Sequence, residues 1–222
     1  MKIYFSSQKG KKRQEDQIKI VEEAAKKHQE ADLLLFGQAF LSGDQALSFD
    51  YKKDIWKASG LYSQEILDLR KIAKENKIAL GFGFYENQKG GIYHSYLIID
   101  KEGESLFKHQ ALGRDWMEKG ACADYRLGHS LGYFELKGKK ISLLLGQDFF
   151  YDDCLLALCE LDDLVDCFIW LAHKKDPRAK ERSQILAKPI YYLTSQGVFL
   201  FKQGKLLEKS SEGENFFRSK LG

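Results

Sequence analysis

Gln38 is the first residue in the chain whose setting suggests chemistry. It closely follows the apolar run from Leu33 to Phe36, and a turn containing Gly43 comes directly after it. A buried strand that ends in this way delivers one side chain to the mouth of a site. A glutamine there cannot accept a proton at neutral pH, but it can hydrogen-bond an amide or a carboxylate. Taken alone, it is most simply a polar cap of the strand.

Two acids and three basic residues farther along the chain are candidates for a charged site: Glu86, Asp148, Lys108, His109 and Arg114. A carboxylate can activate water, and a cation can stabilise the oxyanion that results. A buried glutamate without a cation would be costly. We therefore expect Lys108, His109 or Arg114 to be the partner of Glu86, unless Glu86 is exposed.

The segment around Gln38 resembles a known family signature. Residues 36–43 read Phe-Gly-Gln-Ala-Phe-Leu-Ser-Gly. They are similar to the first signature of the carbon–nitrogen hydrolases, the nitrilase superfamily, which runs roughly Phe-Pro-Glu-Ala-Phe-Leu-Thr-Gly-Tyr. The catalytic glutamate of that signature is replaced here by Gln38, and the resemblance favours a role for Gln38 in lining a site.

A second segment resembles the strand and elbow that carry the family's nucleophilic cysteine. Residues 141–150 read Ile-Ser-Leu-Leu-Leu-Gly-Gln-Asp-Phe-Phe, where the family typically has Gly-Val-Leu-Ile-Cys-Tyr-Asp-Leu-Arg-Phe-Pro-Glu. This register puts Gly146 at the cysteine and Asp148 at a retained aspartate, with Asp152 or Asp153 near the final acid. A strand-end glycine is usually a backbone device. In this register it is a deleted nucleophile.

The family lysine follows a hairpin glycine, a strand and a Tyr-Arg pair. A count from Gly103 places Ala111 at this lysine, whereas a shortened strand would bring Lys108 or His109 there instead. Glu86 ends a Gly-x-x-Glu segment that resembles the one carrying the family's second, lysine-orienting glutamate.

The resemblance implies a reaction for which this chain is expected to lack the three catalytic side chains. In the family the cysteine attacks an amide or nitrile carbon, the lysine stabilises the developing charge and the glutamate moves protons. Losing all three leaves a neutral pocket, which is physically coherent. We expect a homologue that has lost catalysis and binds a small amide or carboxylate, or acts in regulation. The pocket candidates are Glu86, Lys108, His109, Arg114, Gln147 and Asp148.

Two alternatives remain open. In the first, the chain is an amide hydrolase of altered chemistry, in which Glu86 or Asp148 activates water and Lys108 or His109 stabilises the oxyanion. In the second, it is a structural subunit that pairs with an active relative. The resemblance also favours a homodimer, and we expect no cofactor and no metal.

The elements that must position these residues follow from apolar periodicity. We predict helices over 15–30, 63–75, 151–161 and 177–186. We predict strands over 2–6, 32–36, 78–85, 92–100, 105–109, 131–136, 140–146, 165–171, 189–195, 198–202 and 206–209. Asp100 to Gly103 forms a hairpin turn, Asn76 ends the second helix, and Cys154 and Cys159 are small core residues of the third helix. The pattern supports an α/β layered sandwich, and the resemblance implies the four-layer αββα sandwich of the nitrilase superfamily.

Composition limits the remaining possibilities. The 222 residues, 44% of them hydrophobic, are enough for one domain over 1–222. The net charge of +3 is spread over 35 basic and 32 acidic residues, and the basic cluster Lys9 to Arg13 is short and lacks aromatic neighbours. We therefore expect a charged loop, with no nucleic-acid and no membrane partner. The four cysteines show neither metal-type nor secreted-scaffold spacing, which favours a reducing cytoplasm.

Overall fold

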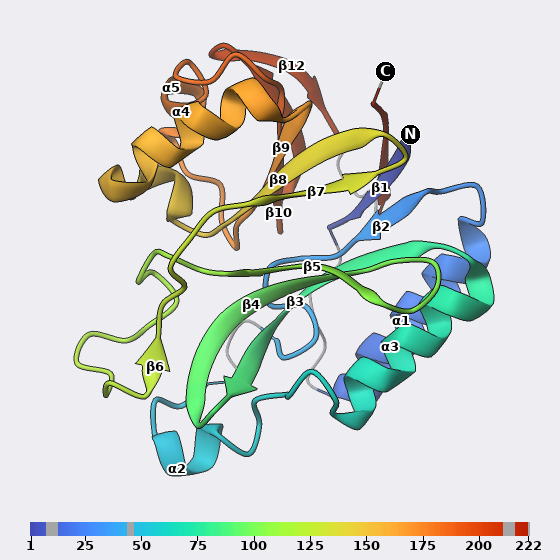
Figure 1. Cartoon of the computed structure of the whole chain (residues 1–222), viewed down its shortest axis with the longest axis vertical. Coiled ribbons are helices and arrows are strands. Elements are labelled where there is room, and N and C mark those ends of the chain that lie inside the picture. Colours follow the sequence, from blue (N-terminus) through green and yellow to red (C-terminus); the bar gives the residue numbers. More distant parts are fainter. Residues whose placement is uncertain (8–12, 44–46, 211–215, 222) are drawn as a thin grey trace.

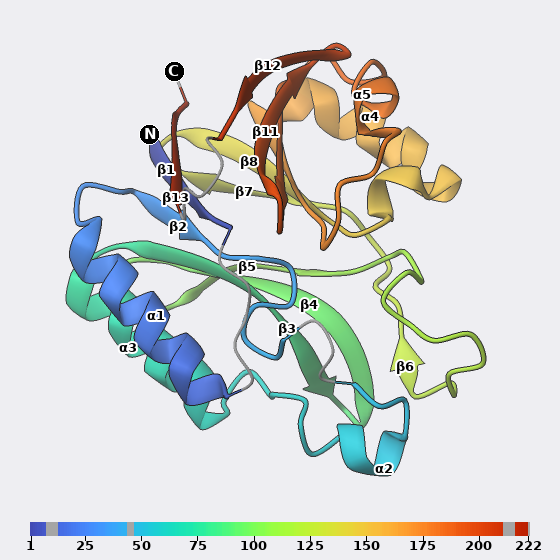
Figure 2. The same ribbon diagram turned by 180° about the vertical axis from the view of Figure 1, so that it is seen from behind.

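Two β-sheets pack face to face, and helices cover the outer face of each (Figures 1 and 2). The computed structural model describes residues 1–7, 13–43, 47–210 and 216–221. Within these ranges the layers run helix, sheet, sheet, helix, which confirms the predicted αββα sandwich. Most of the predicted charged loop, Lys9 to Lys12, lies outside the described residues.

The first sheet has the strand order β13-β1-β2-β3-β4-β5, and β6 pairs with β4. Its strands β1, β2 and β3 are parallel, whereas β3, β4 and β5 form an antiparallel meander. The strands are β1 (Lys2–Ser6), β2 (Leu33–Leu35), β3 (Ala79–Gln88), β4 (Gly91–Ile99), β5 (Ser105–Gln110), β6 (Tyr125–Arg126) and β13 (Phe216–Lys220).

The second sheet has the order β12-β11-β10-β9-β8-β7, with a parallel centre formed by β8, β9 and β10. Its strands are β7 (Tyr133–Leu136), β8 (Lys139–Leu145), β9 (Cys167–Leu171), β10 (Ile190–Thr194), β11 (Gly197–Lys202) and β12 (Lys205–Lys209). Because parallel strands end at the same edge, the residues that follow β2 and β3 form one edge, and those that follow β8 and β9 form another.

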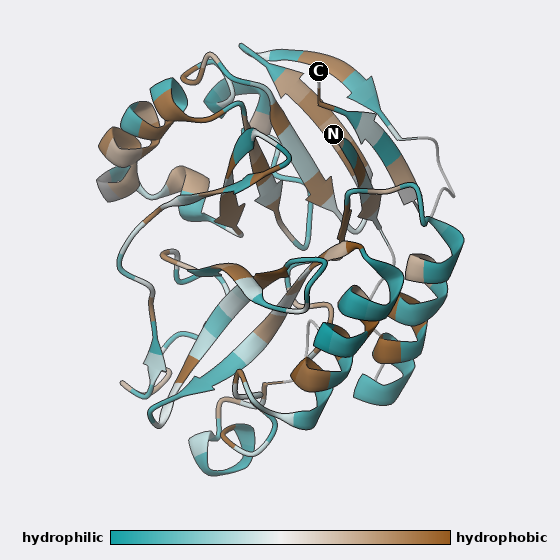
Figure 3. Ribbon diagram, turned by 45° about the vertical axis from the view of Figure 1, so that its right-hand side comes forward, coloured by the Kyte–Doolittle hydropathy of each residue, from teal (hydrophilic) through white to brown (hydrophobic). Residues whose placement is uncertain are grey.

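Helices α1 (Gln14–Lys27) and α3 (Gln64–Asn76) pack on the first sheet, and α4 (Leu155–Leu164) and α5 (Ala179–Arg182) pack on the second. The outward faces of α1 and α3 are mainly hydrophilic (Figure 3). Strand β2 shows why its sequence is continuously apolar. Leu33 and Leu35 pack between the sheets, while Leu34 packs under the helices, so both faces of the strand are buried. No helix in the described ranges is long and apolar enough to cross a membrane.

Several sequence expectations need correction. The left-handed residue that ends α3 is Lys77, with φ 54°, and not Asn76. Cys159 is exposed, because α4 turns Leu158 and Leu161 inward and position 159 lies about 100° around the helix from Leu158. Cys154 is buried, as predicted. The predicted helix over 177–186 is reduced to the single turn α5.

Four elements were not predicted from the sequence: the short helix α2 (Tyr51–Asp54), the 3₁₀ helix η1 (Asp148–Phe150), β6 and β13. The predicted hairpin between β4 and β5 is confirmed, with Gly103 at φ 86° and the Asp100 carboxylate accepting two backbone N–H groups of the turn.

Candidate functional site

Gln38 lies just beyond β2, where the chain crosses over β3. A side chain at Gly83 would overlap the Gln38 carbonyl, so glycine is required there for the crossing. The His94 ring donates from Nε2 to that carbonyl at 2.7 Å. The Gln38 side-chain amide donates to the Leu171 carbonyl and accepts from the His173 N–H, both at 3.1 Å. Gln38 therefore links the end of β2 to the end of β9, from one sheet to the other.

Gly146 lies directly after β8 and has a φ of +49°. A Cβ placed on it would overlap Oδ2 of Asp115 and lie 2.9 Å from the Asp115 Cγ. The other Asp115 oxygen accepts the Gln147 N–H at 3.2 Å, and the Trp170 indole donates to the Gly146 carbonyl at 2.8 Å. At the position where the register predicts a deleted nucleophile, a carboxylate from another loop fills the side-chain space.

Gln38, Asp115 and Gly146 line one cavity with a volume of about 430 Å³. Asp115 is solvent-accessible, although protein surrounds its carboxylate on several sides. This partial desolvation raises the pKa of Asp115, the negative charge of Asp148 raises it further, and the hydrogen bond from Gln147 opposes the shift. The remaining lining residues are Tyr85, His94, Trp116, Gln147, Phe150, Trp170, Ala172, His173, Lys174, Lys175, Asp176, Pro177 and Tyr192.

His109 and Asp148 form a buried pair between the sheets. The His109 ring donates from Nε2 to the Asp148 carboxylate at 2.6 Å, and both side chains are fully buried. The same carboxylate accepts the backbone N–H groups of Leu112, Gly113 and Leu145 at 2.7, 2.9 and 2.9 Å. These four donors tie the end of β5 to the end of β8.

Glu86 and Lys108 form a second pair, 2.6 Å apart. Glu86 is 1% exposed and also accepts hydrogen bonds from Ser95 and Gln110, at 2.6 and 2.9 Å. The neighbour of Glu86 in β3, Tyr85, lines the cavity. Because side chains alternate along a strand, Glu86 points to the opposite face of the sheet. The structure therefore places the Glu86–Lys108 pair and the His109–Asp148 pair on different faces.

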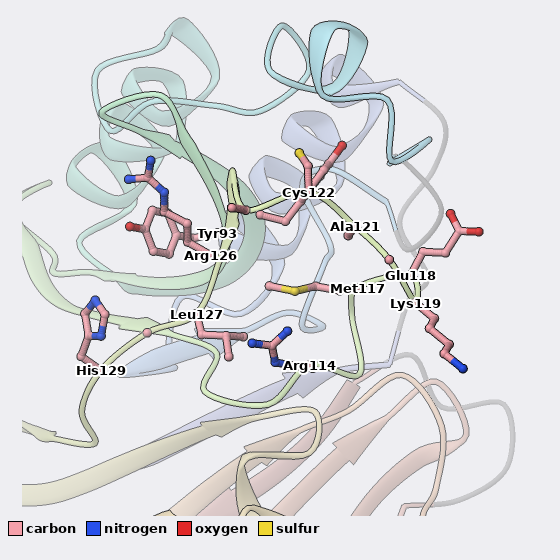
Figure 4. Close-up of a pocket in the computed structure, with 14 residues that line it drawn as sticks. Tyr93, Arg114, Met117, Glu118, Lys119, Ala121, Cys122, Arg126, Leu127 and His129 are labelled. Atoms are coloured by element: carbon pink, nitrogen blue, oxygen red, sulfur yellow. The ribbon is translucent and has the colours of Figure 1, made fainter.

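Two other predicted site residues, Ala111 and Arg114, lie in different surroundings. Ala111 is buried in the core between the sheets, and its N–H donates to the His94 carbonyl at 2.8 Å. Arg114 is exposed and lines a different cavity of about 970 Å³ (Figure 4). In that cavity Arg126 and Lys119 point away from each other. Of the six pocket candidates, Gln147 alone lines the cavity that holds Gln38 and Gly146.

Sequence reasoning missed Asp115 and His94 as cavity residues. Asp115 lies in the irregular connection between β5 and β6, where no periodicity indicates the direction of a side chain. In the described ranges, no group of three or more His, Cys, Asp or Glu residues is placed to hold a metal ion.

Comparison with known proteins identifies the class to which this fold and site belong. The sequence profile of the carbon–nitrogen hydrolase family matches residues 14–154. The chain belongs to the carbon–nitrogen hydrolase family. No curated protein matches it in sequence.

Solved structures of an amidase from Nesterenkonia sp. share the fold. One superposes with a TM-score of 0.79 at 16% identity, covering 98% of this chain and 89% of the amidase. Another is a glutamate-to-glutamine variant after Michael addition of acrylamide at the active-site cysteine. It has a TM-score of 0.78 at 16% identity and covers 100% of this chain and 93% of the amidase. At this identity the likeness establishes the nitrilase-superfamily fold.

Proposed function

We propose that this carbon–nitrogen hydrolase homologue has lost amidase and nitrilase catalysis and binds a small molecule in the 430 Å³ cavity. One observation carries the proposal. At Gly146, where the family register puts the nucleophile, the Asp115 carboxylate fills the side-chain space. A covalent mechanism without its nucleophile typically loses about six decades of rate.

Two further placements support the loss of catalysis. The Gln38 amide is engaged with backbone groups of the second sheet, and a glutamine does not take up a proton at neutral pH. Ala111 is packed in the apolar core between the sheets and supplies no positive charge. The family reaction needs a base, a cation and a nucleophile together, and none of the three positions offers one.

The alternative of altered hydrolysis finds less support. It would use Glu86 or Asp148 with Lys108 or His109, and these residues form two pairs on different faces of the first sheet. The Asp148 carboxylate already accepts four hydrogen bonds while fully buried, which leaves no room for a substrate water. The Glu86 carboxylate accepts three.

The decisive experiment combines turnover with binding. We expect no hydrolysis across a panel of amides, nitriles and esters, together with thermal stabilisation by a subset of small polar compounds. Measurable turnover that is lost in Glu86→Gln would overturn the proposal in favour of altered hydrolysis. If no compound in a broad panel shifts the melting temperature or binds in calorimetry, the binding function is wrong.

Cysteine labelling provides an independent check. In structures of the Nesterenkonia amidase, acrylamide and fluoroacetamide add to the active-site cysteine. In this chain we expect adducts at the exposed Cys122 and Cys159 and no loss of ligand binding. A variant with both exposed cysteines changed to serine serves as the control and should remain unlabelled in the native state. An adduct at Cys154 that abolishes an authentic activity would contradict the assignment of Cys154 to the core.

The proposal includes the homodimer that the family resemblance implies. Analytical ultracentrifugation over a range of protein concentrations tests it, because a dimer sediments as a single species of twice the chain mass. A monomer at all concentrations would remove the dimer from the proposal and leave the binding site unaffected.

A further inference from the structure

The carboxylate of Asp115 occupies a prepared position in the cavity. It lies between two glycines, since a Cβ on Gly146 would overlap one of its oxygens and a Cβ on Gly113 would lie 3.1 Å from the other. Gly113 is itself fixed by the hydrogen bond from its N–H to Asp148. The absence of side chains on both flanks makes the room that the carboxylate fills.

The protein leaves part of the hydrogen-bonding capacity of the Asp115 carboxylate unused. An ionised carboxylate offers about four acceptor sites, and within the protein the Asp115 carboxylate accepts two hydrogen bonds, from the Gln147 N–H and from its own backbone N–H. No lysine, arginine or histidine among the described residues forms an ion pair with it. Partial desolvation and the nearby charge of Asp148 raise the pKa of Asp115. A positive charge placed next to the carboxylate favours its ionised form and so offsets both effects.

Aromatic rings form much of the remaining wall. Trp116 lies 6.0 Å from both Tyr85 and His94, ring centre to ring centre, and Trp170 stacks on Tyr192 at 3.9 Å. All of these rings line the cavity. A carboxylate beside aromatic faces is a combination that attracts organic cations, through charge-assisted hydrogen bonds and through the negative faces of the rings.

The other charges at the cavity leave Asp115 available. Asp176 is neutralised by Arg178, at 2.8 Å, and the Lys175 ammonium lies over the ring of Phe199 at 4.7 Å. Lys174 is exposed and lines the cavity without an ion-pair partner in the described ranges. Its charge is screened by solvent but opposes a cationic ligand weakly.

From this arrangement we propose that the cavity binds a small organic cation, a protonated primary amine whose ammonium group donates to Asp115 and whose carbon chain lies against the aromatic wall. The inference rests on the proposed small-molecule function and specifies the class of ligand. The ammonium group would then lie next to Gly146, which stands at the predicted nucleophile position. In the family, the electrophilic carbon of the substrate lies beside that position.

The test is isothermal titration calorimetry at neutral pH and low salt, with n-butylammonium, butyramide and butyrate as matched probes. We expect the wild-type protein to bind n-butylammonium most tightly. Asp115→Asn keeps the shape of the side chain and removes its charge, so it should weaken binding by about tenfold or more. Asp163→Asn, at an exposed site on α4, is the matched control and should leave the affinity unchanged. Lys174→Gln should strengthen binding, by about twofold.

The outcomes separate this inference from the proposed function. If butyramide or butyrate binds and n-butylammonium does not, the cation is wrong and the small-molecule function stands. If n-butylammonium binds equally to the wild type and to folded Asp115→Asn, the assignment of Asp115 is wrong. If none of the three binds, the inference is overturned, and only the broader panel then decides whether the binding function also fails.

Discussion

Replacing Gly146 with alanine tests the contact on which the proposed function depends. At φ +49° an alanine costs roughly 1–2 kcal/mol relative to glycine. Its Cβ would also overlap the Asp115 carboxylate. That carboxylate must then move away and lose its hydrogen bond to the Gln147 N–H, which is worth about 1 kcal/mol. We therefore expect Gly146→Ala to lower the free energy of unfolding by about 2–3 kcal/mol in all.

A double-mutant cycle separates the two contributions. In an Asp115→Ala background no carboxylate is left to displace, so the cost of Gly146→Ala should fall to the backbone part, which gives a coupling of about 1 kcal/mol. Gly138 provides the matched control, because it also has a positive φ of +71° but nothing lies within 4 Å of its Cβ position. Urea unfolding followed by tryptophan fluorescence measures all the variants. For Gly138→Ala combined with Asp115→Ala, we expect the two losses in free energy of unfolding to add within about 0.5 kcal/mol. If the losses for Gly146→Ala and Asp115→Ala also add within that range, the Asp115 carboxylate does not fill the side-chain space at Gly146.

Three further predictions concern other parts of the site. Asp148→Ala should lower the free energy of unfolding by about 3–5 kcal/mol, because four buried donors lose their acceptor, and a loss below about 1 kcal/mol in urea unfolding would contradict this. Lys108→Met should lower the free energy of unfolding by about 2 kcal/mol, because it leaves the buried Glu86 carboxylate without its cation. The affinity for n-butylammonium should stay within twofold of the wild type, and a larger change would place the Glu86–Lys108 pair in the cavity. Because the raised pKa of Asp115 makes the folded state hold its proton more tightly than the unfolded state, stability falls as pH rises from the ordinary aspartate range, about 4, to the raised value. The stability of Asp115→Asn relative to the wild type should therefore increase over that window in urea titrations, and a constant difference would refute the shift.

The layered arrangement of sheets and helices could be predicted from the sequence because it depends on local, repeating patterns of apolar residues. Leu33, Leu34 and Leu35 are apolar without interruption, which is typical of a strand buried on both faces, and the structure places helices on one side and a second sheet on the other. The same regularity separates Lys108 from His109. Neighbours on a strand point in opposite directions, so the two could not have served the same site as interchangeable replacements for one lysine.

The candidate site was harder to predict, because Asp115, which the sequence did not indicate, comes from an irregular segment. Asp115 approaches Gly146 from the irregular connection between β5 and β6, and no periodic sequence pattern indicates the direction of a loop side chain. The pairing of β13 with β1 joins Lys2 to Lys220 across nearly the whole chain, and such a partner is invisible to any local pattern. The exposure of Cys159 could have been predicted from the sequence, because helical spacing turns it away from the buried Leu158.

Under the proposed loss of catalysis, each of the three predicted triad positions makes contacts that a simple reversion to the family residue would disturb. A glutamate in place of Gln38 would put a second acceptor beside the Leu171 carbonyl, which the present amide satisfies at 3.1 Å. A lysine in place of Ala111 would have to pass through the core between the sheets. A cysteine in place of Gly146 would meet the Asp115 carboxylate. Each reversion alone costs stability and supplies one third of a reaction that needs all three groups. We therefore expect no single reversion to restore amidase activity, and the titration of n-butylammonium against Asp115→Asn remains the more direct test of what this cavity does.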